Sequence, residues 1–139
     1  MPPDNLIDGR AIAREVHAET ESRVAALKEA GVEPSLVFIR VGEDPASRVY
    51  VGMKERTAAK LGIRSETTVL PEDTPESTLL ELLDKLNADS SVHGILVQAP
   101  LPATINEATI FAAVSPNKDV DGFHPVNVGK LLLDRKSVV

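Results

Sequence analysis

Helix-type and strand-type apolar patterns alternate along the chain, and this alternation restricts its fold more than any other feature. Apolar residues at helical spacing predict helices over about 7–30, 45–61 and 104–114, another that starts at 74–76 with an apolar stripe to Leu86, and a short helical turn at 126–133. The runs SLVFIRV at 35–41 and ILVQ at 95–98 are typical of short buried strands, and 63–70 alternates weakly. Such alternation predicts an α/β fold, with a mainly parallel sheet flanked by helices in three layers.

Capping residues mark where these helices begin and end. Asp44-Pro45 supplies a helix N-cap followed by proline in the first turn, and Gly31 and Gly62 are natural helix stops. Thr104 with Glu107 fits a capping box, which predicts that the fourth helix begins there. The polar stretch 116–125 is predicted to be a loop.

Size and composition exclude several classes of protein. A chain of 139 residues with 42% hydrophobic residues is one globular domain. The net charge of -6, with no basic run, disfavours a nucleic-acid partner. Without cysteine there are no disulfides, thiolate nucleophiles or cysteine-based metal sites. The amino terminus resembles no signal or transit peptide, and no apolar stretch approaches the length of about 20 residues that spans a membrane. We therefore expect a cytoplasmic protein.

Common cofactor motifs are missing. The eight glycines never form G-x-G-x-x-G or a P-loop, so we expect no nucleotide cofactor bound by this chain. There is no G-x-S-x-G elbow. His17, His93 and His124 lie far apart in sequence, and we expect no metal.

Ligands of open α/β sheets bind at the carboxyl ends of strands, which directs attention to three stretches. They are 41–50, 98–102 and 119–122. Tyr50 and Lys54 share a helical face and could stack a ring beside an amine, or be a core-edge tyrosine and a solvated lysine. Gln98 closes a buried strand and needs hydrogen-bond partners, from a ligand or from a turn.

Asp119 and Asp121 form the third candidate. Two carboxylates at this spacing could hold a metal, although a solvated loop is the commoner explanation. An aspartate in a rigid loop can also accept two N–H bonds from a guanidine-like ligand edge, such as that of a pterin or guanine.

The ordered motifs together resemble the bifunctional methylenetetrahydrofolate dehydrogenase/methenyltetrahydrofolate cyclohydrolase family. They are S-x-x-Y-V-x-x-K at 47–54, G-I-L-V-Q-x-P-L-P at 94–102 and K-D-V-D-G-F-H-P-x-N-x-G at 118–129. The resemblance covers essentially the whole chain. Ala99 departs from it, since the family often has a bulkier leucine there.

The resemblance implies a role for each matched residue. Lys54 is the catalytic lysine of the cyclohydrolase step, Gln98 orients it, and Asp121 holds the pterin ring. Tyr50 stacks on the aminobenzoyl ring, and Ser47 is a weaker candidate. The other implied substrate contacts are Val51, Gly52, Met53, Val97, Ala99, Pro100 and Leu101. We also hypothesise that a neutral partner such as Gln98 leaves Lys54 able to act as a base, whereas a carboxylate would hold it protonated.

The resemblance also sets expectations for the whole protein. The family oxidises 5,10-methylenetetrahydrofolate to 5,10-methenyltetrahydrofolate with NADP or NAD and hydrolyses the product to 10-formyltetrahydrofolate. We expect residues 1–139 to be its amino-terminal folate-binding domain, with the Rossmann-like NAD(P)-binding domain following Val139. The full-length protein is expected to be a homodimer, and this chain alone a monomer with weak hydrolysis at best and no hydride transfer.

Three other interpretations remain open at this stage. The chain could be a folate-binding module without turnover, or the substrate domain of another two-domain dehydrogenase of the shikimate or amino-acid type. It could also be a structural α/β domain that binds no folate. The set Tyr50, Lys54, Gln98 and Asp121 argues against the second of these interpretations.

Overall fold

Three parallel strands form the centre of the computed structural model, which describes residues 7–133. The strands β1 (Ser35–Val41), β2 (Arg64–Leu70) and β3 (Gly94–Val97) are ordered β2-β1-β3, so the first strand is central. The sheet confirms the predicted parallel arrangement. The helices are α1 (Gly9–Glu29), α2 (Pro45–Lys60), α3 (Glu76–Ala88), α4 (Glu107–Ala113) and α5 (Pro125–Leu133).

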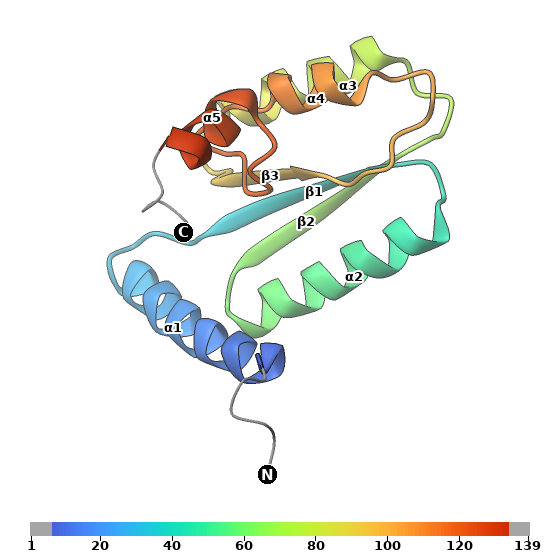
Figure 1. The fold of residues 1–139 in the computed structure, drawn as a ribbon. Helices are drawn as coiled ribbons and strands as arrows, with labels where there is room; N and C mark the ends of the chain where they lie inside the picture. The colour runs from blue at the N-terminus through green and yellow to red at the C-terminus, as the bar shows by residue number, and fades with distance from the viewer. Residues whose placement is uncertain (1–6, 134–139) are drawn as a thin grey trace.

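Helices cover both faces of the sheet (Figure 1). Because β1 is buried on both faces, its alternate residues pack in opposite directions. Val37, Ile39 and Val41 join the main core with α3 and α4, and Phe38 points the other way, toward Val51 of α2. This arrangement is the three-layer α/β fold that the sequence predicts.

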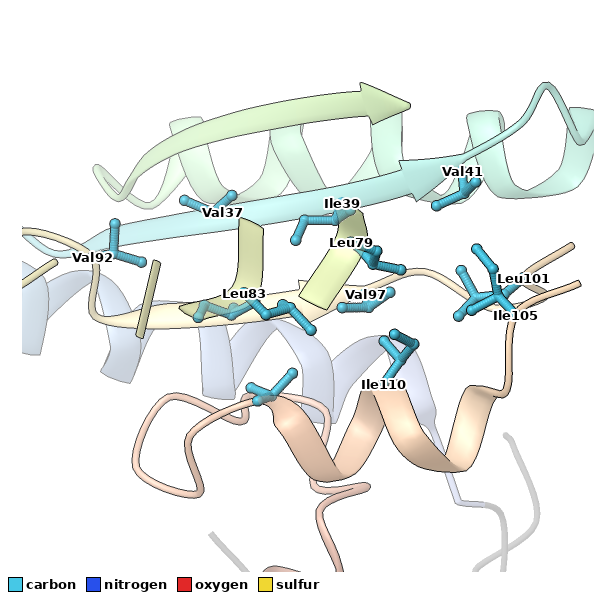
Figure 2. Close-up of a cluster of buried hydrophobic side chains, with 12 residues drawn as sticks. Val37, Ile39, Val41, Leu79, Leu83, Val92, Val97, Leu101, Ile105 and Ile110 are labelled. Carbon is cyan, nitrogen blue, oxygen red and sulfur yellow. The ribbon is translucent and has the colours of Figure 1, made fainter. Parts of the chain in front are cut away.

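The main core is aliphatic and lies between the sheet and the helices α3 and α4 (Figure 2). Leu79 and Leu83 of α3 are fully buried, as the leucine stripe of that helix predicts, and Ile110 of α4 is fully buried in the same cluster. Burying one such leucine stabilises the fold by roughly 1.5–3 kcal/mol. This core holds the carboxyl ends of β1 and β3 at fixed positions.

The fourth helix begins later than predicted, so the prediction of a capping box formed by Thr104 and Glu107 is wrong. Asn106 is the N-cap, and its side chain accepts from Thr109 N at 3.2 Å. The Glu107 carboxylate instead accepts from Leu101 N at 2.9 Å. Ile105 is buried in the main core, and its N–H donates to Pro102 O. The residues before 106 are therefore used in a turn that buries an isoleucine, and the helix begins after it.

The terminal helices differ from expectation in other ways. Helix α1 has the predicted extent, but its predicted apolar stripe is mostly exposed: Val24 is buried, whereas Ile12 and Val16 are 50% and 53% exposed. The segment predicted as a short helical turn is the nine-residue helix α5. No helix within residues 7–133 combines the length and hydropathy that a bilayer crossing requires. The predicted boundary at Val139 lies outside the described residues.

Candidate functional site

Helix α2 begins at the carboxyl end of β1 and carries the first candidate residues. Asp44 caps it by accepting from Ser47 N at 2.7 Å, and Pro45 opens the first turn, as predicted. The hydrogen bond from Ser47 lowers the pKa of Asp44, so the cap is an anion at neutral pH. Ser47 is buried, and its hydroxyl donates to Ala99 O at 3.4 Å. The helix start is thereby attached to the loop that follows β3.

Lys54 and Gln98 meet across this junction. Lys54 Nζ donates to Gln98 Oε1 at 3.0 Å, although the residues are 44 positions apart in sequence. The Gln98 amide nitrogen donates to Ala99 O at 2.8 Å, so its oxygen is the atom turned toward the lysine. Gln98 N donates to Ile39 O at 2.8 Å, which fixes the backbone at the end of the sheet. The lysine therefore has an uncharged, oriented hydrogen-bond acceptor.

Asp121 brings a carboxyl group into the same region from the loop before α5. Partial removal of this carboxyl from water raises its pKa, the charge of Lys54 opposes that shift, and the charge of Asp119 adds to it. More than a third of the residue is exposed, and within residues 7–133 its carboxyl accepts no hydrogen bond. The charge of Lys54 thus acts on the Asp121 carboxyl, which is an acceptor open to a ligand.

Asp119 is placed differently from Asp121. Its carboxylate accepts hydrogen bonds from Gly122 N, His124 N and the Asn127 amide within the loop. Both of its oxygens therefore already accept hydrogen bonds, so Asp119 is not arranged to bind a metal ion together with Asp121. Within the described part of the chain, no three His, Asp or Glu side chains gather as metal ligands would.

The predicted substrate contacts fall into two groups. Tyr50 and Met53 are 55% and 51% exposed on α2, next to half-buried Gly52, and Pro100 and Ala99 lie beside Gln98. A second set has its side chains in the hydrophobic core rather than on the surface: Val51, Val97 and Leu101. Their contact with a ligand stays a prediction.

Two hollows flank the Lys54–Gln98 pair. One, of about 380 Å³, is lined almost entirely by apolar atoms and runs from Lys54 between α2 and the sheet. The other, of about 400 Å³, lies at the carboxyl edge between the residues 41–44 and 100–102. Tyr50, Gln98 and Asp121 line neither of these two hollows; Tyr50 and Asp121 are exposed and Gln98 is half-buried.

Val120 is a site residue that sequence reasoning missed. It lines the apolar hollow beside Lys54, and its side chain lies against Gly94, where a Cβ would approach it within 2.5 Å. The pattern Asp-Val-Asp is the signal that could have found it, because a valine between two loop carboxylates is placed to face an apolar wall. Val120 holds the Asp121 loop against β3.

The start of α2, at the carboxyl end of β1, does not suit a dinucleotide. The turn between β1 and α2 contains one glycine, Gly42, and continues with the carboxylates of Glu43 and Asp44. Asp44 already occupies Ser47 N at the start of α2, which a pyrophosphate would need. No chemical step in this chain is therefore assigned to a nicotinamide cofactor.

The fold and site define a class: a parallel α/β domain that presents an amine, an amide and a carboxyl group at the carboxyl edge of its sheet. The sequence-family model of the tetrahydrofolate dehydrogenase/cyclohydrolase catalytic domain matches residues 7–121 of this chain. This chain belongs to that family. Membership rules out the alternative of a shikimate or amino-acid dehydrogenase domain.

Individual relatives agree with this assignment. The chain is 51% identical over 130 residues to bifunctional protein FolD from Geotalea daltonii, covering 94% of this chain and 46% of that protein. The solved structure of the bifunctional FolD enzyme from Campylobacter jejuni matches with a TM-score of 0.88 and 44% identity, covering 91% of this chain and 45% of that one.

A third relative was solved with a cofactor. The Trypanosoma brucei methylenetetrahydrofolate dehydrogenase-cyclohydrolase, complexed with NADP and an inhibitor, matches with a TM-score of 0.85 and 36% identity. The match covers 94% of this chain and 45% of that structure. The chain therefore spans about half the length of the relatives it matches.

Proposed function

We propose that residues 1–139 are the folate-binding catalytic domain of a bifunctional enzyme of one-carbon metabolism. The full-length protein oxidises 5,10-methylenetetrahydrofolate to 5,10-methenyltetrahydrofolate and hydrolyses that product to 10-formyltetrahydrofolate. Family membership supports this proposal. The single observation that carries it is the hydrogen bond from Lys54 Nζ to Gln98 Oε1, next to the open carboxyl of Asp121.

The hydrolysis requires a base near a cationic carbon. In methenyltetrahydrofolate the bridging carbon shares a positive charge with two nitrogens, so water can add to it. The water oxygen bonds to that carbon, and one water proton leaves to the Lys54 amine. The carbon's bond to N5 then breaks as the Lys54 ammonium returns that proton to N5, and the remaining hydroxyl proton leaves to solvent as the formyl C=O forms on N10, so that one proton is released overall. Gln98 suits this role because its amide accepts from the lysine without a charge that would favour the ammonium.

The other residues bind the substrate in this proposal. The Asp121 carboxylate accepts two N–H bonds from the pterin edge, a charge-assisted and bidentate arrangement. Tyr50 stacks on the aminobenzoyl ring, which its exposed position on α2 permits. Close contacts come from the backbone and side chains of 51–53 and of 97–101.

The cofactor and partners belong to the full-length protein. We propose that it uses NADP for the oxidation, as supported by the Trypanosoma brucei relative solved with that cofactor. We propose a cytoplasmic homodimer that engages tetrahydrofolate derivatives and no nucleic acid or membrane, and a monomer for this chain alone. The dimer rests on family resemblance alone, and sedimentation of the chain and of the full-length protein tests it.

The decisive experiment measures hydrolysis of methenyltetrahydrofolate by loss of its absorbance. The chain is compared with Lys54→Ala and with Lys60→Ala, which removes an exposed lysine from the end of the same helix. We expect turnover above the buffer rate in the wild type and in Lys60→Ala, but not in Lys54→Ala. Equal turnover above the buffer rate in the wild type and Lys54→Ala would refute the role of Lys54.

Binding without turnover is the second candidate function. It is favoured by the open surface at Tyr50 and Met53 in a chain that spans about half the length of its relatives. Equilibrium binding of tetrahydrofolate distinguishes the two candidates: a chain that binds it but hydrolyses nothing above the buffer rate is a binding module. A chain that binds no folate at all contradicts both proposals.

A further inference from the structure

Asp119 organises the loop that carries Asp121. Its Oδ1 accepts from Gly122 N at 3.0 Å, and its Oδ2 accepts from His124 N and the Asn127 amide nitrogen, both at 2.9 Å. Partial burial alone would raise the pKa of Asp119, but the hydrogen bonds from Asn127, His124 and Gly122 outweigh it, so the pKa is lowered. The group is therefore an anion at the centre of the loop at neutral pH.

The beginning of this loop is attached to the sheet and to α3. Ile95 N donates to Lys118 O at 2.7 Å, and Ile95 and Asp119 form a parallel bridge beside β3. The Lys118 ammonium donates to Leu86 O at 2.9 Å and to Asp89 O at 2.7 Å, both near the end of α3. The backbone at Asp119 is thus attached to β3, and the residue before it to the end of α3.

In the sequence, Asp121 lies between Lys118 and Asp119, which are attached to β3 and the end of α3, and Gly122 and His124, whose N–H groups donate to Asp119. It directly precedes Gly122, which has a φ of 73° and whose N–H is bound by Asp119. A residue other than glycine would be strained at that φ. On its far side, Asn127 of α5 donates both to Asp119 and to Pro116 O at 2.9 Å. The backbone of Asp121 is anchored on both sides, while its own carboxyl stays open.

We propose that Asp119 is the positioning residue for substrate recognition, because it holds the Asp121 carboxyl beside Lys54 and toward the bound ring. The identity of the ring as a pterin rests on the proposed function. Asp119 acts through Asp121 and does not touch the substrate, since its own oxygens are used within the loop. Asn127 supports the same arrangement from α5.

The position of Asp119 has an electrostatic consequence that can be measured. The charged groups that act on the Asp121 carboxyl are Lys54 of α2, which lowers its pKa, and Asp119 of its own loop, which raises it. Removal of the Asp119 charge should therefore lower the pKa of Asp121. A residue that stabilised the loop without acting on the Asp121 carboxyl would leave the pKa of Asp121 unchanged.

The test uses Asp119→Asn, which keeps the shape but turns one acceptor oxygen into a donor. Its matched control is Asp84→Asn, an identical change on the exposed face of α3. We expect tetrahydrofolate to bind about tenfold more weakly to Asp119→Asn, the loss expected for about one charge-assisted hydrogen bond. The acid limb of its binding profile should move to lower pH, with hydrolysis at saturating substrate retained. Asp84→Asn should behave as wild type.

Two further measurements keep the proposal decidable. If Asp119→Asn does not fold, Asn127→Ala removes one of the three donors and should weaken binding by a smaller factor. If the wild-type chain binds no folate, the proposed function fails, and the carboxyl titration of Asp121 by carbon NMR without ligand still tests the role of Asp119. Unchanged folate binding in the folded variants, or an unchanged Asp121 titration in Asp119→Asn, would overturn the proposal.

Discussion

Asp121, which we propose binds the substrate, has a cost in stability. Its carboxyl has a raised pKa because it is partly withdrawn from water and accepts no hydrogen bond within residues 7–133. The folded state therefore holds the proton more tightly than the unfolded chain does, and ionisation opposes folding. As pH rises through 3.8 and the raised pKa, this residue progressively lowers the free energy of unfolding. A ligand that supplies N–H donors reverses that cost.

The pH dependence of binding follows from the same shift. Tetrahydrofolate should bind most tightly above the raised pKa of Asp121 and lose affinity as the pH falls through it, because a protonated carboxyl accepts one N–H bond fewer. The Asp121→Asn variant should bind about tenfold more weakly near neutral pH, with no acid limb from this group. Calorimetric titration across this range checks the prediction. An acid limb retained in Asp121→Asn would assign the titration to another group.

The same variant should also be at least as stable as the wild type. Near neutral pH, Asp121→Asn removes a partly buried charge that has no hydrogen-bond donor, so its unfolding midpoint in urea should stay equal or rise. A large loss of stability would show that the Asp121 carboxylate supports the fold, contrary to its placement as an open acceptor.

Among the elements, α3 shows most clearly how a local pattern predicts packing. Leu83→Ala should lower the free energy of unfolding by about 2–5 kcal/mol, because this leucine is fully buried in the main core. Leu82→Ala, one residue away and only half-buried, should cost less than half as much. Urea unfolding of the two variants measures the difference, and equal losses would contradict the described core.

Helix α1 shows where a local pattern is insufficient. Ile12→Ser should change the free energy of unfolding by less than about 0.5 kcal/mol, because the side chain is half-exposed, whereas Val24→Ser should be clearly destabilising. Periodicity predicts a helix and an apolar face, but it does not say whether anything covers that face. An Ile12→Ser loss as large as that of Val24→Ser would place α1 in the core.

Elements with local signals are predictable from sequence, and contacts between distant segments are not. Asp44-Pro45 predicts the start of α2 because the cap and its partner are three residues apart. The start of α4 was missed because burial of Ile105 competes with the local capping pattern. Lys54 and Gln98 could be assigned to one edge by topology, and to one another only through the family resemblance.

The Asp119 network was equally hidden from sequence. The aspartate could be read as a metal ligand or a loop residue, and only the folded loop brings Gly122, His124 and Asn127 around its carboxylate. The bond from Gly122 N spans three residues and follows a common local pattern of aspartate, whereas those from His124 N and the Asn127 amide span five and eight residues and need the folded loop.

At the scale of the whole molecule, the acidic β1–α2 turn does not suit a dinucleotide, and the function we propose for this chain is folate binding. The chain supplied with methylenetetrahydrofolate and NADP should form no reduced nicotinamide, because hydride transfer needs the cofactor carbon held against the substrate. The absorbance of the reduced cofactor measures this, with the full-length protein as the positive control. Reduction by the chain alone would show that it binds the cofactor at a surface other than the acidic β1–α2 turn.

We propose that an uncharged Gln98 leaves Lys54 able to act as the base, and Gln98→Glu changes the charge of this one partner. The substitution keeps the size of the side chain and places a carboxylate beside the amine. Hydrolysis of methenyltetrahydrofolate at saturating substrate is compared in the wild type and the variant, with tetrahydrofolate binding measured alongside. We expect hydrolysis to fall about a hundredfold in Gln98→Glu while binding is largely retained. Hydrolysis at the wild-type rate in Gln98→Glu would contradict it.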